Sequence, residues 1–120
     1  MYDEIIDRMG KFVIMDITVH DYRMTLAAIY GPNGDNPDFF HVFFNHINNF
    51  DNSSLIIAGD WNVVQDYNLD TLNYSGQNNP KSQLQIHQMM NDYDLVDIWR
   101  KTHAQIRRFS WKGPNKNKVI

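Results

Sequence analysis

The sequence predicts an α/β fold in which helices flank a sheet of mixed direction. Three features support this fold class: short runs rich in β-branched residues, longer segments with apolar residues at spacings of three and four, and polar or glycine-containing gaps between them. The expected order is strand, strand, helix, strand, loop, helix and strand, a pattern typical of helices packed on a sheet. That order predicts the fold class but does not determine a function.

Residues 11–19 and 22–30 predict the first two strands, because both runs are rich in β-branched residues and partly alternate in polarity. His20 and Asp21 form a turn-sized gap between them, so the two strands are expected to pair as an antiparallel hairpin. A loop signal, Gly31-Pro32-Asn33-Gly34, follows the second strand. Tyr30 is therefore expected at the tip of that strand.

A helix is expected from Asn36 onward. Asn36 is a suitable N-cap, Pro37 fits the first helical position, and Asp38 places an acid in the first turn. Aromatic and aliphatic residues then recur at helical spacing and predict one apolar face, formed by Phe40, Phe43, Phe44, Ile47 and Phe50.

The segment from Leu55 to Asn62 is the central feature of the sequence. Four apolar residues, 55–58, indicate a buried strand, and Gly59 lets the backbone turn so that Asp60 and Asn62 leave the sheet at its carboxyl end. Open α/β sheets bind ligands at that edge. A carboxylate and a carboxamide two residues apart can hold a hard cation and a phosphate oxygen together.

The remaining elements are expected after a long polar stretch, residues 65–81. Residues 82–85, Ser-Gln-Leu-Gln, fit a capping box and predict that a helix begins there. Residues 95–100 are interpreted as the exit of this helix followed by a short strand or turn, and residues 105–111 as a last strand.

Composition limits the class of protein. The 120 residues are 42% hydrophobic and 13% aromatic, which suits one compact domain over residues 1–120 and excludes a disordered tail. The absence of cysteine excludes a disulfide framework and a thiolate zinc site. No signal-peptide pattern and no apolar run of membrane-spanning length are present. We therefore expect an intracellular protein with no membrane partner.

Charge is divided unevenly along the chain. From Ile98 onward there are seven basic residues and no acidic one, whereas four basic and fourteen acidic residues precede it and give that part a net charge of −10. Phe109 and Trp111 lie among these basic residues, a combination that suits a phosphate backbone with bases against aromatic rings. The alternative interpretation is a solvated terminal loop.

Three motifs together resemble the endonuclease/exonuclease/phosphatase superfamily. They are Ile29-Tyr30-Gly31-Pro32-Asn33, Ile57-Ala58-Gly59-Asp60-Trp61-Asn62, and residues 94–100 followed by Phe109-Ser110-Trp111. More narrowly, the chain resembles the endonuclease domain of LINE-type (non-LTR) retrotransposon polyproteins, relatives of the apurinic/apyrimidinic endonucleases. The three motifs match in order and spacing, and the resemblance covers nearly the whole chain. The third motif favours the retrotransposon branch over relatives that act on inositol phosphates or sphingomyelin.

The resemblance implies roles for matching residues. Asp60 corresponds to the catalytic aspartate beside the divalent metal, Mg²⁺ or Mn²⁺, and Asn62 to the asparagine that holds the scissile phosphate and the metal site. Tyr30 corresponds to the tyrosine that hydrogen-bonds the phosphate. Trp61 occupies a position where the family often has Phe, which is compatible if its side chain faces the core. Nucleic-acid contacts are expected from the basic, aromatic segment, through Arg107, Arg108, Ser110, Trp111 and Lys112.

The resemblance also implies that residues 1–120 form a single partial domain of the family's α/β sandwich, truncated at both ends. In the family, an asparagine and a metal-binding glutamate precede the hairpin, and an Asp-His pair follows downstream; neither pair is matched here. Asp3 and Glu4 lack the strand-end context of that glutamate. A partial sandwich would leave one sheet face uncovered, which predicts self-association.

The expected function is metal-dependent hydrolysis of DNA phosphodiesters by an endonuclease of the retrotransposon or apurinic type, with the isolated chain inactive. The alternative is a non-catalytic remnant or nucleic-acid-binding module that keeps the fold. A nuclear location follows if the chain is part of a retrotransposon protein. Asp97 is interpreted as holding a backbone group or a neighbouring arginine, with a catalytic role as the alternative.

Overall fold

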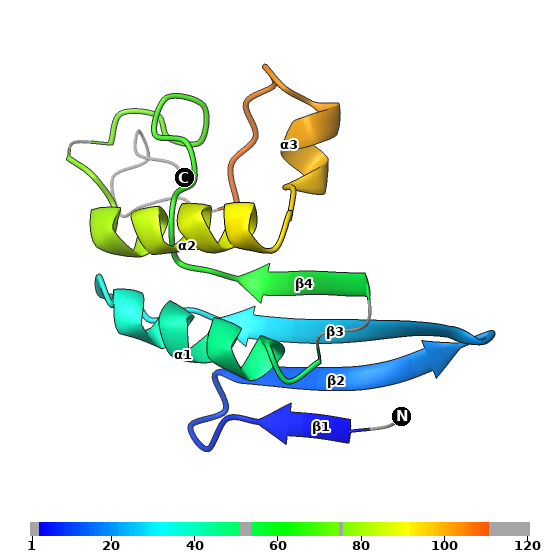
Figure 1. Ribbon diagram of the computed structural model, residues 1–120. Coiled ribbons are helices and arrows are strands. Elements are labelled where there is room, and N and C mark those ends of the chain that lie inside the picture. The colour runs from blue at the N-terminus through cyan, green and yellow to red at the C-terminus, as the bar shows by residue number, and fades with distance from the viewer. Residues whose placement is uncertain (1–2, 51–53, 75, 111–120) are drawn as a thin grey trace. The chain divides into compact units, whose positions relative to one another are not determined.

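Four strands form one mixed sheet in the first half of the chain (Figure 1). The structure is a computed structural model that describes residues 3–50, 54–74 and 76–110. It divides into two compact units, Met1–Asn62 and Val63–Ile120. The elements of the first unit are β1 (Asp3–Ile6), β2 (Phe12–Val19), β3 (Tyr22–Tyr30), α1 (Pro37–Ile47) and β4 (Ser54–Asp60); those of the second are α2 (Pro80–Asp92) and α3 (Ile98–Thr102).

The α/β class is confirmed, with the sheet order β1-β2-β3-β4. β1 and β3 both pair with β2 in antiparallel fashion, whereas β3 and β4 run parallel. Consequently β1, β3 and β4 end at the same edge of the sheet, and β2 begins there. β1 was not expected, and its first residue, Asp3, pairs with Asp16 in the middle of β2, away from the edge where Tyr30 and Asp60 lie.

The predicted hairpin is confirmed. β2 and β3 pair along their full length from Phe12 and Ile29 to Val19 and Tyr22, leaving His20 and Asp21 as the turn. Both turn residues have positive φ, 49° and 63°, as a two-residue hairpin that follows the right-handed strand twist requires. The backbone geometry thus agrees with the short polar gap in the sequence.

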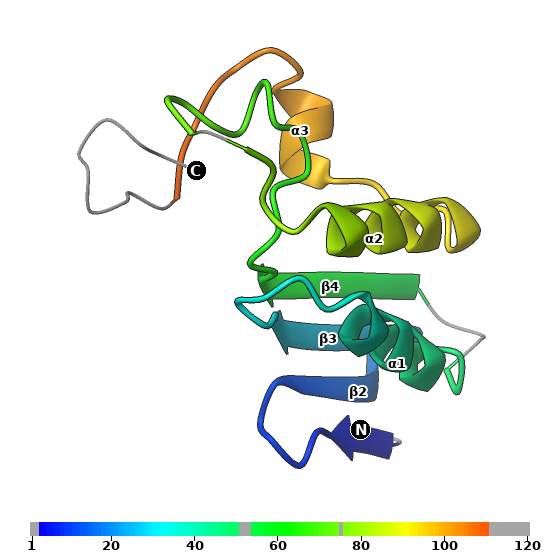
Figure 2. The ribbon, with the colours of Figure 1, turned by 90° about the vertical axis from the view of Figure 1, so that its left-hand side faces the viewer.

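The predicted first helix is confirmed as α1. The side chain of Asn36 accepts a hydrogen bond from the Phe39 N–H at 3.2 Å, and Pro37 is the first helical residue. Its apolar face is buried through Phe40, Phe43, Phe44 and Ile47, and Phe50, just past the helix, is buried as well. Figures 1 and 2 together show α1 lying on one face of the sheet.

The core of the first unit lies between α1 and this face. Alternate residues of β2, including Phe12 and Ile14, are buried. The ring centroids of Phe12 and Phe43 are 5.3 Å apart in an edge-on arrangement. The intervening residues of β2, such as Met15, are half-buried on the opposite face. Within the described residues of the first unit no helix covers that opposite face, and its use in self-association stays a prediction.

One ion pair joins a buried carboxylate of this core to an arginine at the surface. Asp16 is buried, and the Arg23 guanidinium donates to both of its carboxylate oxygens, at 3.2 and 3.1 Å from Nε. These hydrogen bonds hold the pKa of the Asp16 carboxyl below its ordinary value of 3.8, although burial acts in the opposite direction. Asp16 is therefore satisfied as a charged group inside the sheet-helix layer.

The strand predicted at residues 55–58 is confirmed as part of β4, but the prediction that this strand is buried was wrong. β4 pairs only with β3 among the described strands, none of its residues is buried, and Ile56 is 53% exposed. A strand with a single neighbour leaves one side open, and four successive apolar residues do not show whether a strand is central or at an edge.

The second unit differs from the sequence prediction in three places. α2 begins at Pro80, so Ser82 lies inside the helix and is buried rather than serving as a cap. Residues 98–102 form the short helix α3, not a strand, and Asp97 is its N-cap, accepting from the Arg100 N–H at 2.9 Å. This confirms a structural role for Asp97. Residues 105–110 form no strand, and Trp111 lies outside the described residues.

Neither unit contains, within the described residues, a helix long and apolar enough to cross a membrane. The longest described helix, α2, has 13 residues. The expectation of one domain over residues 1–120 stays a prediction, and the two units are described separately below.

Candidate functional site

Tyr30 and Asp60 meet at the edge of the sheet where β3 and β4 end. They are register partners in the parallel pair, and each is the last residue of its strand. The parallel direction places both strand ends on the same side, as expected for a ligand edge in an α/β sheet. The structure therefore brings together two of the three residues that the sequence assigned to catalysis.

Asn62 joins them through the loops that follow the two strands. Its backbone N–H donates to Asp60 Oδ1 at 3.0 Å, and its side-chain Nδ2 donates to the Gly31 carbonyl at 2.7 Å. The Gly31 N–H in turn donates to the Asp60 carbonyl at 2.7 Å. Asn62 has a φ of 52°, a left-handed conformation that asparagine adopts more readily than most residues. These bonds tie the two loops into one polar edge.

Two glycines make this close approach possible. A Cβ added to Gly31 would lie 2.0 Å from the Trp61 carbonyl oxygen, and one added to Gly59 would lie 2.0 Å from the Ile29 carbonyl oxygen. Gly59 also has a φ of 138°, which other residues rarely adopt. The glycines of the Tyr30-Gly31 and Gly59-Asp60 motifs are thus required by backbone packing.

Trp61, between the two polar residues, points to the other side of its strand end. Its ring is stacked on Phe40 with centroids 6.1 Å apart and makes an edge contact with Phe43 at 6.3 Å. The Trp61 side chain therefore faces the aromatic core, which is the condition stated above for a Trp at this position. Because this ring is held by α1, the backbone on either side of it is fixed, and the Asp60 and Asn62 side chains leave from an anchored segment.

The chemical groups at the edge are accessible to a ligand. Tyr30 is 47% exposed, Asp60 is exposed, and Asn62 is half-buried. The edge offers a carboxylate that can accept a proton or bind a cation, and a phenol and a carboxamide that can donate hydrogen bonds. The described ranges contain no group of three or more His, Asp or Glu residues that could hold a metal ion.

Lys11 is a residue of this edge that the sequence analysis did not assign. It lies just before β2, and its ammonium is 4.4 Å from the centre of the Tyr30 ring. A lysine between Gly10 and an apolar run carries no sequence signal for such a role. Only the sheet register, which places the start of β2 beside the end of β3, brings it to Tyr30.

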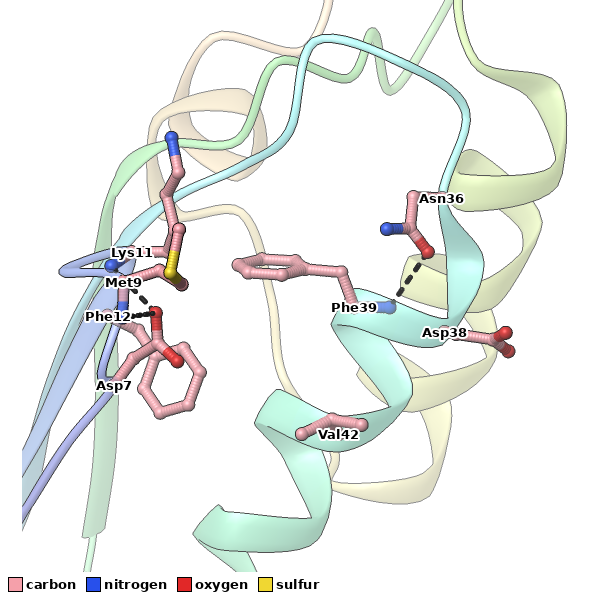
Figure 3. A pocket seen from close by; sticks show the side chains of 8 residues that line it. All are labelled: Asp7, Met9, Lys11, Phe12, Asn36, Asp38, Phe39 and Val42. Atoms are coloured by element: carbon pink, nitrogen blue, oxygen red, sulfur yellow. Dashed lines mark hydrogen bonds between the residues drawn. The ribbon is translucent and has the colours of Figure 1, made fainter.

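A shallow cavity of about 270 Å³ lies beside Lys11 in the first unit. Four apolar and four polar side chains line it, from the connection between β1 and β2 and from the start of α1 (Figure 3). The Asp7 carboxylate in its wall accepts from the backbone N–H groups of Met9 and Lys11, at 3.1 and 3.0 Å. Asp7 is thus used to fix the connection that carries Lys11.

The predicted nucleic-acid contacts lie in the second unit. Arg107, Arg108 and Ser110 are exposed, and Trp111 and Lys112 lie outside the described residues. The Arg107 guanidinium donates to the Thr71 carbonyl and lies 5.6 Å from the centre of the Phe109 ring. Arg107 therefore has a structural partner, and nucleic-acid binding by this segment stays a prediction.

A scan against protein-family models gives no match to this chain, and a search of the curated proteins gives none either.

Proposed function

We propose that the edge formed by Tyr30, Asp60 and Asn62 is a site for nucleic-acid phosphodiesters, of the type found in metal-dependent endonucleases of LINE-type retrotransposons. The observation that carries the proposal is the pairing of Tyr30 with Asp60 at the ends of parallel strands, with Asn62 hydrogen-bonded to Asp60 and to Gly31 in the loop after β3. Three residues singled out from two separate sequence motifs thus lie on one edge.

The arrangement of the first unit is compatible with one layer of the superfamily's α/β sandwich. It has a mixed sheet, α1 on one face, and the three residues at the carboxyl ends of β3 and β4. Membership of the endonuclease/exonuclease/phosphatase superfamily, and of its retrotransposon branch, is part of this proposal and rests on the three sequence motifs.

Each residue contributes a distinct interaction to phosphodiester hydrolysis. The Asp60 carboxylate would accept a hydrogen bond from the attacking water and orient it, while its Oδ1 is itself held by the Asn62 N–H. The Tyr30 phenol, half exposed at the strand end, would donate to a phosphate oxygen. Asn62, fixed by its bond to the Gly31 carbonyl, would position the phosphate beside Asp60.

The chemistry of the donor set is suitable for Mg²⁺ or Mn²⁺. Mg²⁺ is commonly held by one or two carboxylates, with water and substrate phosphate completing its ligands. Asp60 would supply the carboxylate, and Asn62 lies next to it. When bound, the metal would neutralise charge on the phosphate.

A binding module without catalysis is the second candidate. The observation that favours it is the lack, within the described residues, of a group of three or more side chains able to hold a metal ion. A metal held by Asp60 would then depend on the substrate phosphate for further ligands. Metal-dependent binding of DNA without hydrolysis would be the result.

The test combines binding and nicking. Affinity of the chain for a labelled duplex is measured with and without Mg²⁺, and conversion of supercoiled plasmid is followed under the same conditions. We expect Mg²⁺ to strengthen DNA binding and Asp60→Asn to remove most of that strengthening. The expected loss of affinity in Mg²⁺ is about tenfold, which corresponds to about 1.4 kcal/mol of binding free energy. Asp21→Asn is the matched control, because Asp21 is an exposed hairpin residue of positive φ at the other end of β3.

The outcomes separate the candidates. Nicking that Asp60→Asn abolishes supports the endonuclease, and Mg²⁺-dependent binding without nicking supports the binding module. If Asp60→Asn and Asp21→Asn have the same effect on the Mg²⁺ dependence, the edge is not the phosphodiester site. Circular dichroism of each variant verifies that the fold is retained.

A further inference from the structure

Lys11 is fixed to the end of β3 by its backbone. Its N–H donates to Asp7 Oδ2 at 3.0 Å, and its carbonyl accepts from the Tyr30 N–H at 2.7 Å. The residue is therefore held from both directions although it lies in the connection before β2. A side chain that starts from a fixed backbone loses less conformational entropy when it binds a ligand.

The side chain of Lys11 lies along the exposed phenol of Tyr30. Its ammonium is 4.4 Å from the ring centre, within the range of a cation–π interaction. In Figure 3 the ammonium points away from the Asp7 carboxylate, the nearest acid of the cavity wall on the same connection. The aromatic ring thus orients the charge without neutralising it.

Lys11 forms no ion pair with any residue in the described ranges. Ion pairs in these ranges include Asp16 with Arg23 and Asp70 with Arg100. The Lys11 ammonium beside the candidate site therefore has no carboxylate partner among the described residues and can bind an anionic ligand. The first unit is otherwise rich in acids, including Asp60 at the same edge, so this cation has a large local effect on the approach of a phosphate.

We propose that Lys11 is a phosphate-binding residue of this edge, contacting the phosphodiester next to the one held by Tyr30 or a second oxygen of the same group. The proposal rests on the proposed function of the edge. The ammonium is a compact point charge with three donors, so it contacts phosphate oxygens of any sequence. Lys11 therefore adds affinity without base specificity.

The experiment is the salt dependence of duplex DNA binding. Each phosphate contact by a lysine contributes about 0.9 to the slope of log affinity against log salt. We expect Lys11→Gln to lower that slope by about one and to weaken binding about eightfold at 0.1 M salt. Lys11→Arg, which keeps the charge, should retain most of the slope.

Arg8→Gln is the matched control. It removes the same charge from an exposed position three residues away, in the connection between β1 and β2. If both variants lower the slope equally, Lys11 acts only through net charge, and the proposal is wrong. An unchanged slope in Lys11→Gln also overturns it, as does the absence of any binding by the wild-type chain.

The experiments distinguish an error in the Lys11 proposal from an error in the proposed function of the edge. Asp60→Asn tests the Mg²⁺ dependence of binding, whereas Lys11→Gln tests the slope in a fixed, low concentration of Mg²⁺. A normal Asp60 effect with no Lys11 effect contradicts the lysine proposal alone. A Lys11 effect without an Asp60 effect places phosphate binding at Lys11 and contradicts the metal-dependent function.

Discussion

Different interactions stabilise the first unit and the second unit internally. In the first, backbone pairing of four strands defines the structure, and α1 adds an aromatic layer. In the second, side chains hold the loops: Asp66 Oδ1 accepts from the N–H groups of Asn68 and Leu69, and Arg100 donates to the carbonyls of His103 and Ile106. Stability of the first unit should therefore depend on apolar burial, and that of the second on individual polar side chains.

Phe43→Ala should have the largest effect. Phe43 is fully buried and contacts the rings of Phe12, Phe44 and Trp61. Truncation of a buried aromatic residue costs about 3–5 kcal/mol. Chemical denaturation of the purified protein measures this loss. Val42→Ala, at a neighbouring position that is 49% exposed, should change stability by less than about 0.5 kcal/mol. Equal costs in the two variants would contradict the role assigned to the aromatic layer.

Arg100→Ala should have an intermediate effect that is confined to the second unit. The guanidinium donates to the carbonyls of His103 and Ile106 and pairs with Asp70, so its removal leaves three acceptors, two of them partly buried, without this donor. The expected cost is about 1–3 kcal/mol. Amide hydrogen exchange should accelerate in residues 98–106 and stay unchanged in β2 and β3. Lys101→Ala, at an exposed position, serves as the control; faster exchange throughout both units would refute the separation.

The smallest expected effect is on the stability of the first unit at acid pH. Because the pKa of Asp16 is lowered in the folded protein, its contribution to stability is complete above the ordinary value of 3.8 and is lost as the pH falls through the lowered pKa. Arg23→Lys keeps the charge and loses the planar contact with both carboxylate oxygens, so the loss should begin at a higher pH. Denaturation midpoints between pH 7 and acid measure this shift. An identical pH profile in wild type and variant would contradict it.

Local sequence signals predicted the first unit well. The gap at His20 and Asp21 defined a hairpin, and the spacing of three phenylalanines and one isoleucine defined the buried face of α1. Both features depend on residues close in sequence. Missing from the prediction were β1, which has only four residues, and the position of β4 at the edge of the described sheet, since an apolar run does not indicate how many neighbours a strand has.

The two Asn-Pro pairs illustrate why the second unit was harder. Asn36-Pro37 and Asn79-Pro80 both begin helices, but only Asn36 caps through its side chain; Asn79 has a φ of 46° and no such bond. The capping-box pattern that begins at Ser82 predicted a start for α2 that was too late, since the helix begins at Pro80. α3, with five residues, is too short for a periodic pattern, so its cap, Asp97, was its only signal.

The candidate site was predictable only in part, because some of its residues are marked by local sequence patterns and one is placed by long-range pairing. Tyr30, Asp60 and Asn62 were found because each follows an apolar run and matches a motif, and their register confirms that the first two lie together. Lys11 was not found because its position depends on a hydrogen bond between its carbonyl and the Tyr30 N–H, 19 residues later in the chain.

The parallel pairing of β3 and β4 also determines when this edge forms during folding. The β2–β3 hairpin closes a two-residue turn, whereas Tyr30 and Asp60 meet only after the intervening chain, with α1, has crossed back over the sheet. Loop-closure entropy makes the second event the costlier one. A chain that presents Asp60 beside Tyr30 has therefore already paired β4 with β3, so formation of the polar edge marks the closure of this long-range pairing.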